Sequence, residues 1–119
     1  MAIPSGAGTE VLKKAFFAGL TDTDVKLIDG VADHIYTTLL ISFTETATAT
    51  ESLHMYIFQS ATNDSTNRIE LLHGQTLGSY ETFIYSERVI LVGTDELVIA
   101  TNGTANVDVW CSYIDQDWT

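Results

Sequence analysis

The last part of the chain alternates apolar and polar side chains in steps of two. Successive side chains of a β-strand point to opposite faces, so this alternation predicts a strand over residues 107–114. One face would carry Val107, Val109, Cys111 and Tyr113, and the other Asp108, Trp110, Ser112 and Ile114. We expect the first set to face a core, and residues 115–119 to form an exposed acidic and aromatic tip.

Similar alternation recurs along most of the chain, interrupted by short polar turns. Residues 35–44 form the longest run, and Asn102-Gly103 is the strongest hairpin signal, directly before the last strand. Further strands are predicted at residues 25–28, 53–59, 69–72, 82–85, 88–92 and 97–101. With no helical crossover between them, about eight strands predict an all-β fold, an antiparallel β-sandwich that is jelly-roll-like.

Residues 9–20 fit two patterns. Apolar side chains recur there at helical spacing, and Thr9 is a suitable helix cap. The neighbouring apolar pairs Val11-Leu12 and Phe16-Phe17 also suit a strand that is buried on both faces. The β-rich context favours a strand.

The first eight residues are small and contain the only proline, Pro4. They predict an extended N-terminal arm, and such a segment is typical both of an arm that docks on a neighbour and of a frayed terminus. A chain of 119 residues has the size of one domain. We therefore expect an arm over residues 1–8 and one β-sandwich domain over residues 9–119.

The chain carries 16 acidic residues against 5 basic ones, which gives a net charge of −11. Nucleic-acid binding depends on neutralising phosphates with Lys and Arg, so we expect no nucleic-acid partner. Anionic membrane surfaces are disfavoured for the same reason. The N-terminus lacks the features of a signal peptide, and no apolar run has the length of a membrane span. These features predict a soluble product that is made in a cytoplasm.

The residue types used in catalysis and metal binding form no recognisable site. Cys111 is the only cysteine, and its inward position predicts an inert core thiol. The histidines are scattered, whereas zinc needs convergent ligands: His34, His54 and His73. The acidic residues near the C-terminus predict a solvated rim, with a loosely bound cation as the alternative: Asp108, Asp115 and Asp117. No serine stands in a nucleophile elbow. We expect no enzyme activity, no cofactor and no metal site.

Aromatic side chains are the stronger functional signal. Tyr36, Tyr56, Phe58, Trp110 and Trp118 take outward or terminal positions in the predicted strands. Outward aromatic residues are typical of a protein interface or of a second buried face. The alternative is a platform on which sugars stack.

Three segments carry a resemblance to a known group of proteins: Met1–Leu12 (MAIPSGAGTEVL), His34-Ile35-Tyr36-Thr37 and Val107–Thr119 (VDVWCSYIDQDWT). The chain resembles small β-sandwich virion structural proteins of tailed bacteriophages, of the capsid decoration or cement type. The likeness runs over most of the chain and is strongest at both ends. It contains no catalytic motif.

This resemblance implies a non-enzymatic protein that binds and stabilises the outer surface of an assembled capsid. Its partners would be the major capsid protein and further copies of itself, commonly as a trimer. A terminal arm would reach the neighbours, which adds Ile3 and Pro4 to the expected interface residues. The protein would be made in the host cytoplasm and end on the exterior of the virion.

Two alternatives stay open on the sequence. One is another part of the virion, such as a neck, tail or head-fibre β-domain. The other is a small carbohydrate-binding module that uses Trp110, Trp118 and nearby acidic residues. The number of copies in each virion separates the first alternative from a decoration protein, and quenching of tryptophan fluorescence by sugars tests the second.

Overall fold

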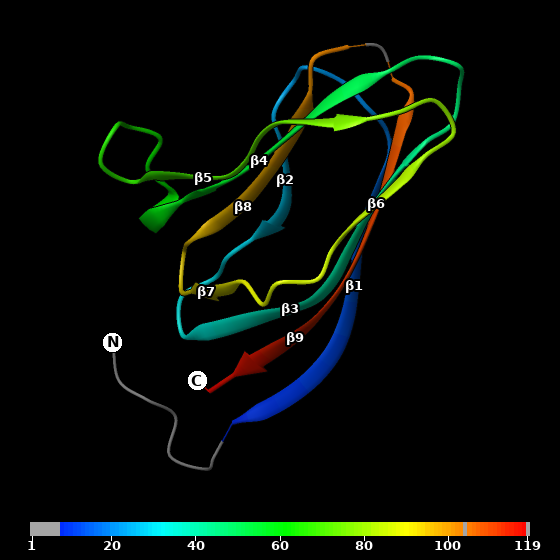
Figure 1. Cartoon of the computed structure of the whole chain (residues 1–119). Helices are drawn as coiled ribbons and strands as arrows, with labels where there is room; N and C mark the ends of the chain where they lie inside the picture. Colours follow the sequence, from blue (N-terminus) through cyan, green and yellow to red (C-terminus); the bar gives the residue numbers. More distant parts are fainter. Residues whose placement is uncertain (1–7, 104, 119) are drawn as a thin grey trace.

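The computed structural model describes residues 8–103 and 105–118, which fold into two antiparallel β-sheets that face each other (Figure 1). The described elements are β1 (Thr9–Leu20), β2 (Val25–Asp29), β3 (His34–Glu45), β4 (Glu51–Phe58), the 3-10 helix η1 (Gln59–Ala61), β5 (Arg68–Leu77), β6 (Thr82–Tyr85), β7 (Ile90–Val92), β8 (Glu96–Thr101) and β9 (Val107–Asp117). The predicted all-β antiparallel sandwich is confirmed. The expected arm lies outside the described residues, except for Gly8.

The strand order is that of a jelly roll. Sheet A has the order β1-β9-β3-β6, with β7 also paired to β3, and sheet B has the order β2-β8-β4-β5. Because β6 and β7 pair with successive parts of β3, they act as two pieces of one strand, and each sheet has four strand positions. The chain crosses repeatedly from one sheet to the other, as in double-sheet jelly rolls.

Two boundaries concern the strands at the ends of the chain. Residues 9–20 form strand β1, not a helix, because they pair with β9 along nearly their whole length. Strand β9 does not end at Ile114 as predicted; it continues to Asp117 and pairs there with both Thr9 and His34. The expected exposed tip is therefore wrong for residues 115–117, and Asp115 is only 4% exposed.

Strand β5 is also longer than the sequence predicts. The alternation predicted a strand only over residues 69–72, but β5 continues to Leu77. His54 pairs with His73 and Leu53 with Gln75, so Gly74 is an extra residue in the pairing with β4. Gly74 has a φ of +79°, which glycine adopts at no steric cost. The glycine marks a bulge inside the strand, not its end.

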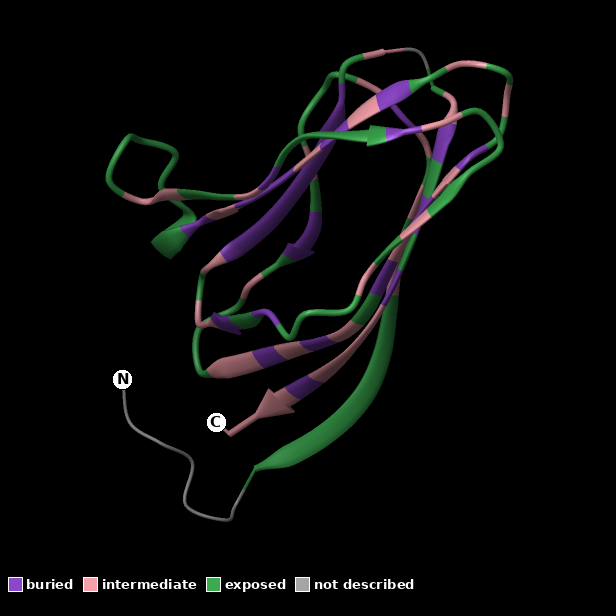
Figure 2. Ribbon diagram, viewed as in Figure 1, coloured by how far each residue is buried: buried purple, intermediate pink, exposed green. Residues whose placement is uncertain are grey.

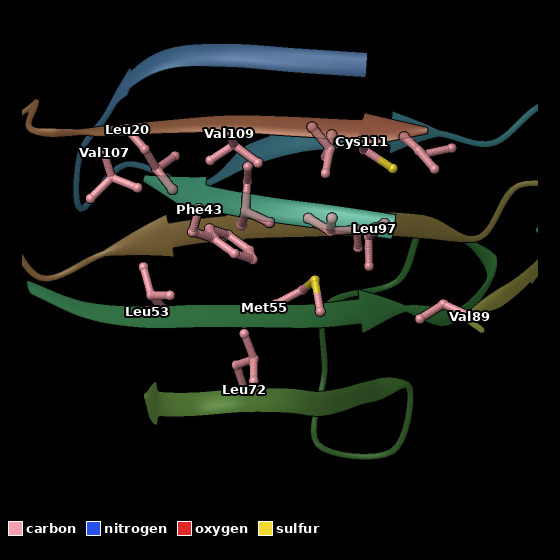
Figure 3. Packing of buried hydrophobic residues seen from close by; sticks show 14 of the residues in the cluster. Leu20, Phe43, Leu53, Met55, Leu72, Val89, Leu97, Val107, Val109 and Cys111 are labelled. Atoms are coloured by element: carbon pink, nitrogen blue, oxygen red, sulfur yellow. The ribbon is translucent and has the colours of Figure 1, made fainter. Parts of the chain in front are cut away.

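Inward-facing side chains of both sheets form one continuous core (Figure 3). Val107, Val109 and Cys111 of β9 are at most 3% exposed, as their alternation predicted. They belong to the same cluster as Leu53 and Met55 of β4 in the opposite sheet. Every second side chain at the start of β9 therefore lies in the core, and the side chains between them point away from it.

In strand β3, the residues that face the core change from even-numbered to odd-numbered positions at a bulge. The unbroken alternation of residues 35–44 placed Tyr36 on the face opposite Ile41, hence outward. The pairing of β3 with β9 shifts between Thr38 and Leu40, so Tyr36 and Ile41 both enter the core cluster. Tyr36 is 4% exposed, and its hydroxyl accepts a hydrogen bond from the Val31 backbone N–H at 3.0 Å. The outward position expected for Tyr36 is wrong.

The core position of Val109 gives a first prediction. Val109 lies between Phe17 of β1 and Phe43 of β3, so Val109→Asp would bury an unpaired carboxylate. The free energy of unfolding should fall by about 4 kcal/mol or more, a large part of a small domain's stability. Urea unfolding followed by circular dichroism measures this. Ser112→Ala, on the other face of the same strand, should change it by less than about 0.5 kcal/mol. A Val109→Asp variant as stable as the wild type would contradict the register of β9.

Candidate interaction surface

The surface of sheet A that points away from the core is the outer face of sheet A. Directly opposed residues of antiparallel strands point to the same side, so the strand register arranges this face in rows. Read from β1 through β9 and β3 to β7 or β6, the rows are Leu12, Ile114, Thr37 and Ile90, then Lys14, Ser112 and Leu40, then Phe16, Trp110, Ser42 and Ile84. Asp108, Thr44 and Thr82 follow in the next row.

This outer face carries large apolar side chains that are accessible. Leu12 is 71% exposed, Phe16 63%, Ile90 52%, Ile84 46% and Trp110 44%. Figure 2 shows β1, at the edge of the sheet, exposed along most of its length. Single exposed apolar residues are ordinary, but contiguous apolar surface on a soluble chain is typical of an interaction site.

An aromatic pair lies on this face. The rings of Phe16 and Trp110 stack with their centroids 5.8 Å apart and an angle of 18° between their planes. The Lys14 ammonium lies 5.4 Å from the centre of the Trp110 ring, within the range of a cation–π interaction. The pair borders a shallow hollow whose lining includes Ser42 and Asp108.

Within the part of the chain that the structure describes, three of the five basic residues form ion pairs with carboxylates, and two do not. Lys13 pairs with Asp115, Lys26 with Glu96 and Arg68 with Glu70, at distances of 2.8, 2.9 and 3.0 Å. Among the described residues, no carboxylate lies within ion-pair distance of the other two cations, Lys14 and Arg88. Lys14 is exposed on the outer face, and Arg88 donates a hydrogen bond to the Leu39 carbonyl at the same sheet.

At the C-terminal end of β9, an ionic cluster around the buried carboxylate of Asp115 joins β1, β3 and β9. Asp115 Oδ2 accepts a hydrogen bond from Lys13 Nζ at 2.8 Å, and Asp115 Oδ1 lies 2.7 Å from His34 Nδ1. Asp117 Oδ1 lies 3.7 Å from the second nitrogen of His34. Burial acts to raise the pKa of Asp115, but the hydrogen bonds from Lys13 and His34 outweigh it, and the pKa is lowered. The carboxylate is stabilised in its charged form.

Tyr56 and Phe58 lie on the outer face of sheet B, as the alternation predicted, but they are covered. The Arg68 guanidinium lies 3.8 Å from the Tyr56 ring centre and 5.7 Å from that of Phe58. The Tyr56 hydroxyl donates a hydrogen bond to Asp24, and burial followed by this bond raises the pKa of Tyr56. Tyr56 is 3% and Phe58 7% exposed, so of the two alternatives for outward aromatic residues they fit the second buried face. They form a second small buried cluster with Val98.

The other expected interface residues lie in different places. Trp110 is exposed as predicted. Trp118 is half-buried, and its backbone N–H donates to the Asp33 carbonyl at 3.3 Å. Ile3 and Pro4 lie outside the described residues. The sequence did not identify Leu12, Ile84 and Ile90 as one surface with Trp110, because that requires the pairing register of four strands.

The described part of the chain holds no group of His, Cys, Asp and Glu residues that could bind a metal ion. Burial raises the pKa of the Cys111 thiol to about 12, so the thiol is protonated at neutral pH and a weak nucleophile. Within the described ranges, no helix is long and apolar enough to cross a membrane.

No known protein-family model matches this chain, and no curated protein sequence matches it. Solved structures do. A chain of the infectious bursal disease virus particle aligns with a TM-score of 0.59 and 9% identity over 96% of this chain. The present chain spans only 32% of the length of that viral chain.

Two other similar chains are matched over nearly their full length. A chain from the capsid structure of Helicobacter pylori bacteriophage KHP30 aligns with a TM-score of 0.54 and 13% identity, over 98% of this chain and 92% of that chain. A chain from the disulfide-linked pili of Bacillus endospores aligns with a TM-score of 0.55 and 12% identity, over 100% and 97%. At such low identity these likenesses establish the fold: a β-sandwich that also occurs in viral capsid structures.

The Asp115 cluster gives a prediction for pH. A carboxyl group whose pKa is lower in the folded than in the unfolded state stabilises the fold above its unfolded pKa of about 4 and loses this contribution as the pH falls through its folded pKa. The free energy of unfolding should therefore decrease below about pH 4. Asp115→Asn should be about 2 kcal/mol less stable at pH 7 and lose less on acidification. Urea unfolding at a series of pH values measures both, with Asp22→Asn, an exposed position between β1 and β2, as the control. Equal pH dependence of Asp115→Asn and the wild type would contradict the role of this cluster.

Proposed function

We propose that this chain is a virion structural protein that binds the outer surface of an assembled phage capsid as a decoration protein. The observation that carries the proposal is the likeness to a chain of a phage capsid structure over 98% of this chain and 92% of that chain. The two chains are nearly equal in length. The match therefore pairs one small chain with another, not with one domain of a larger chain.

The charge of the chain is consistent with this function. A net charge of −11 repels like copies at long range and keeps free subunits soluble. A subunit that binds only the assembled shell stabilises it by mass action, without any chemical step. The partners proposed for this role are the major capsid protein and further copies of this chain.

The single cysteine argues against a disulfide-linked pilus. A chain with one cysteine can be joined by a disulfide to one other copy, so disulfides cannot extend it into a polymer. Cys111 is also completely buried in the core of the sandwich. The likeness to the endospore pilus is therefore a likeness of fold, and we do not extend its assembly chemistry to this chain.

The aromatic geometry also argues against a sugar-binding platform. Sugars stack on open ring faces, but the Trp110 ring is stacked with Phe16 and lies close to the Lys14 ammonium. Trp118 is half-buried at the end of β9. Neither tryptophan resembles the flat, open platform that a carbohydrate-binding module requires.

The number of copies in each virion tests the proposed placement. Purified virions of the phage that encodes this chain should contain it in a number comparable to the shell subunits, measured by quantitative mass spectrometry against the major capsid protein. Immunogold labelling should cover the head. Only a few copies, or label confined to the neck, tail or fibres, would contradict a decoration role and favour one of those parts.

The proposed attachment arm gives a prediction that separates binding from folding. Deleting residues 2–7 should leave the melting temperature nearly unchanged, because small residues with one proline contribute little to a core. The same deletion should weaken cosedimentation with phage heads that lack the protein. Gly8 is kept because a Cβ there would approach the Asp117 carbonyl to 2.7 Å, which shows close packing.

The matched control replaces residues 2–7 with a Gly-Ser segment of equal length. It should bind as weakly as the deletion if the side chains of the arm, such as Ile3 and Pro4, make the contact. A large loss of thermal stability in either variant would show that the arm is part of the sandwich.

A further inference from the structure

We infer that the outer face of sheet A is the contact between two copies of this chain, packed face to face about a two-fold axis. The inference does not depend on the proposed place in a virion, because it concerns the purified chain alone. Its basis is the arrangement of apolar and charged residues on that face. The occupant is a second copy because the face is complementary to itself.

Self-complementarity follows from the rows of the face. Phe16 and Trp110 pair in the central row. Lys14 lies one row to one side of them, opposite Ser112, and Asp108 lies one row to the other side, two residues from Trp110 on β9. An axis in the plane of the face, across the strands and through the central row, exchanges these two outer rows. It brings the aromatic pairs of the two copies into contact with each other.

The same operation brings opposite charges together. Lys14 of one copy lies over the row that contains Asp108 of the other copy, and each dimer holds this pair twice. Lys14 has no carboxylate partner among the described residues of its own chain. Asp108 uses Oδ1 to accept the Gly19 backbone N–H at 3.0 Å and is exposed. If two copies packed without exchanging these rows, Lys14 would have no carboxylate opposite it.

The area that the two copies share suits a weak dimer. Because the axis passes through the row of Trp110, residues 107–113 of β9 overlap with the same residues of the other copy, a length of about 23 Å at about 3.3 Å for each residue. Four strands about 4.8 Å apart give a width of about 19 Å, hence about 440 Å² on each copy, which is in the range of weak and transient interfaces. Packing of two sheets through apolar faces is also how the core of this sandwich forms.

The oligomeric state of the full chain tests the inference first. Sedimentation equilibrium of the purified chain over a range of concentrations should fit a monomer–dimer equilibrium with a dimer of twice the 13.0 kDa chain mass. Trp110→Ser should weaken dimerisation at least about a hundredfold, because the substitution removes a central aromatic side chain and, by the two-fold symmetry, does so in both copies. Tyr80→Ser is the matched control, since Tyr80 is 69% exposed in a turn outside the face, and it should leave dimerisation unchanged.

A charge exchange tests the two-fold arrangement itself. Lys14→Glu alone and Asp108→Lys alone should each weaken the dimer about tenfold, because a repulsion replaces an attraction at two places. The double variant Lys14→Glu/Asp108→Lys should restore most of the affinity. Within one chain the two residues are too distant to interact, since Asp108 lies four residues, about 13 Å, from the residue that pairs with Lys14. Restoration therefore reports a contact between copies.

Circular dichroism and melting temperatures establish that each variant is folded. Should Trp110→Ser or Asp108→Lys fail to fold, Lys14→Glu, which changes an exposed side chain on the edge strand, still tests the pairing. A chain that stays monomeric at high concentration would overturn the inference and leave the face for another partner. A trimer, a dimer unaffected by Trp110→Ser, or a double variant no better than its parents would overturn the two-fold arrangement.

Discussion

The hydrogen bonding of β9 on both of its edges is the constraint on which the rest of this structure depends. Its register with β1 and β3 sends Val109 and Cys111 into the core and leaves Trp110 on the outer face. Because side chains alternate with a period of two, a slip of one residue would exchange these sets. The Asp115 cluster fixes the same register, since only this pairing places Lys13 and His34 beside the buried carboxylate.

Local alternation predicted the fold class because a strand with one buried and one exposed face has alternating apolar and polar residues in its own sequence. It predicted β9 as a strand and its inward residues correctly. It could not predict where the parity of a strand changes, and the bulge between Thr38 and Leu40 therefore reversed the expected position of Tyr36. It likewise ended the strand at residue 72, before Gly74, where the glycine allows a bulge and β5 continues.

The candidate surface was less predictable than the core, because it depends on contacts between distant segments. The sequence marked Tyr56 and Phe58 as outward, and only the fold shows that Arg68 of the next strand covers them. Trp110 was identified from its parity alone. Its neighbours on the surface come from four strands, from Leu12 to Ile90, and no local pattern links them. The acidic end of β9 appeared solvated because its cationic partner, Lys13, lies 102 positions away.

The jelly-roll sandwich itself does not select a partner, since similar folds occur in a phage capsid and in a bacterial pilus. Selection must come from side chains that the core does not require. Phe16 and Trp110 are such residues: they lie on the face of sheet A that the core does not use, and polar residues there would leave the core unchanged. Exposed in water, they favour non-specific association, which the net charge of −11 opposes only at long range. An apolar face of this size on an acidic chain is therefore best explained by an assembled state in which it is covered.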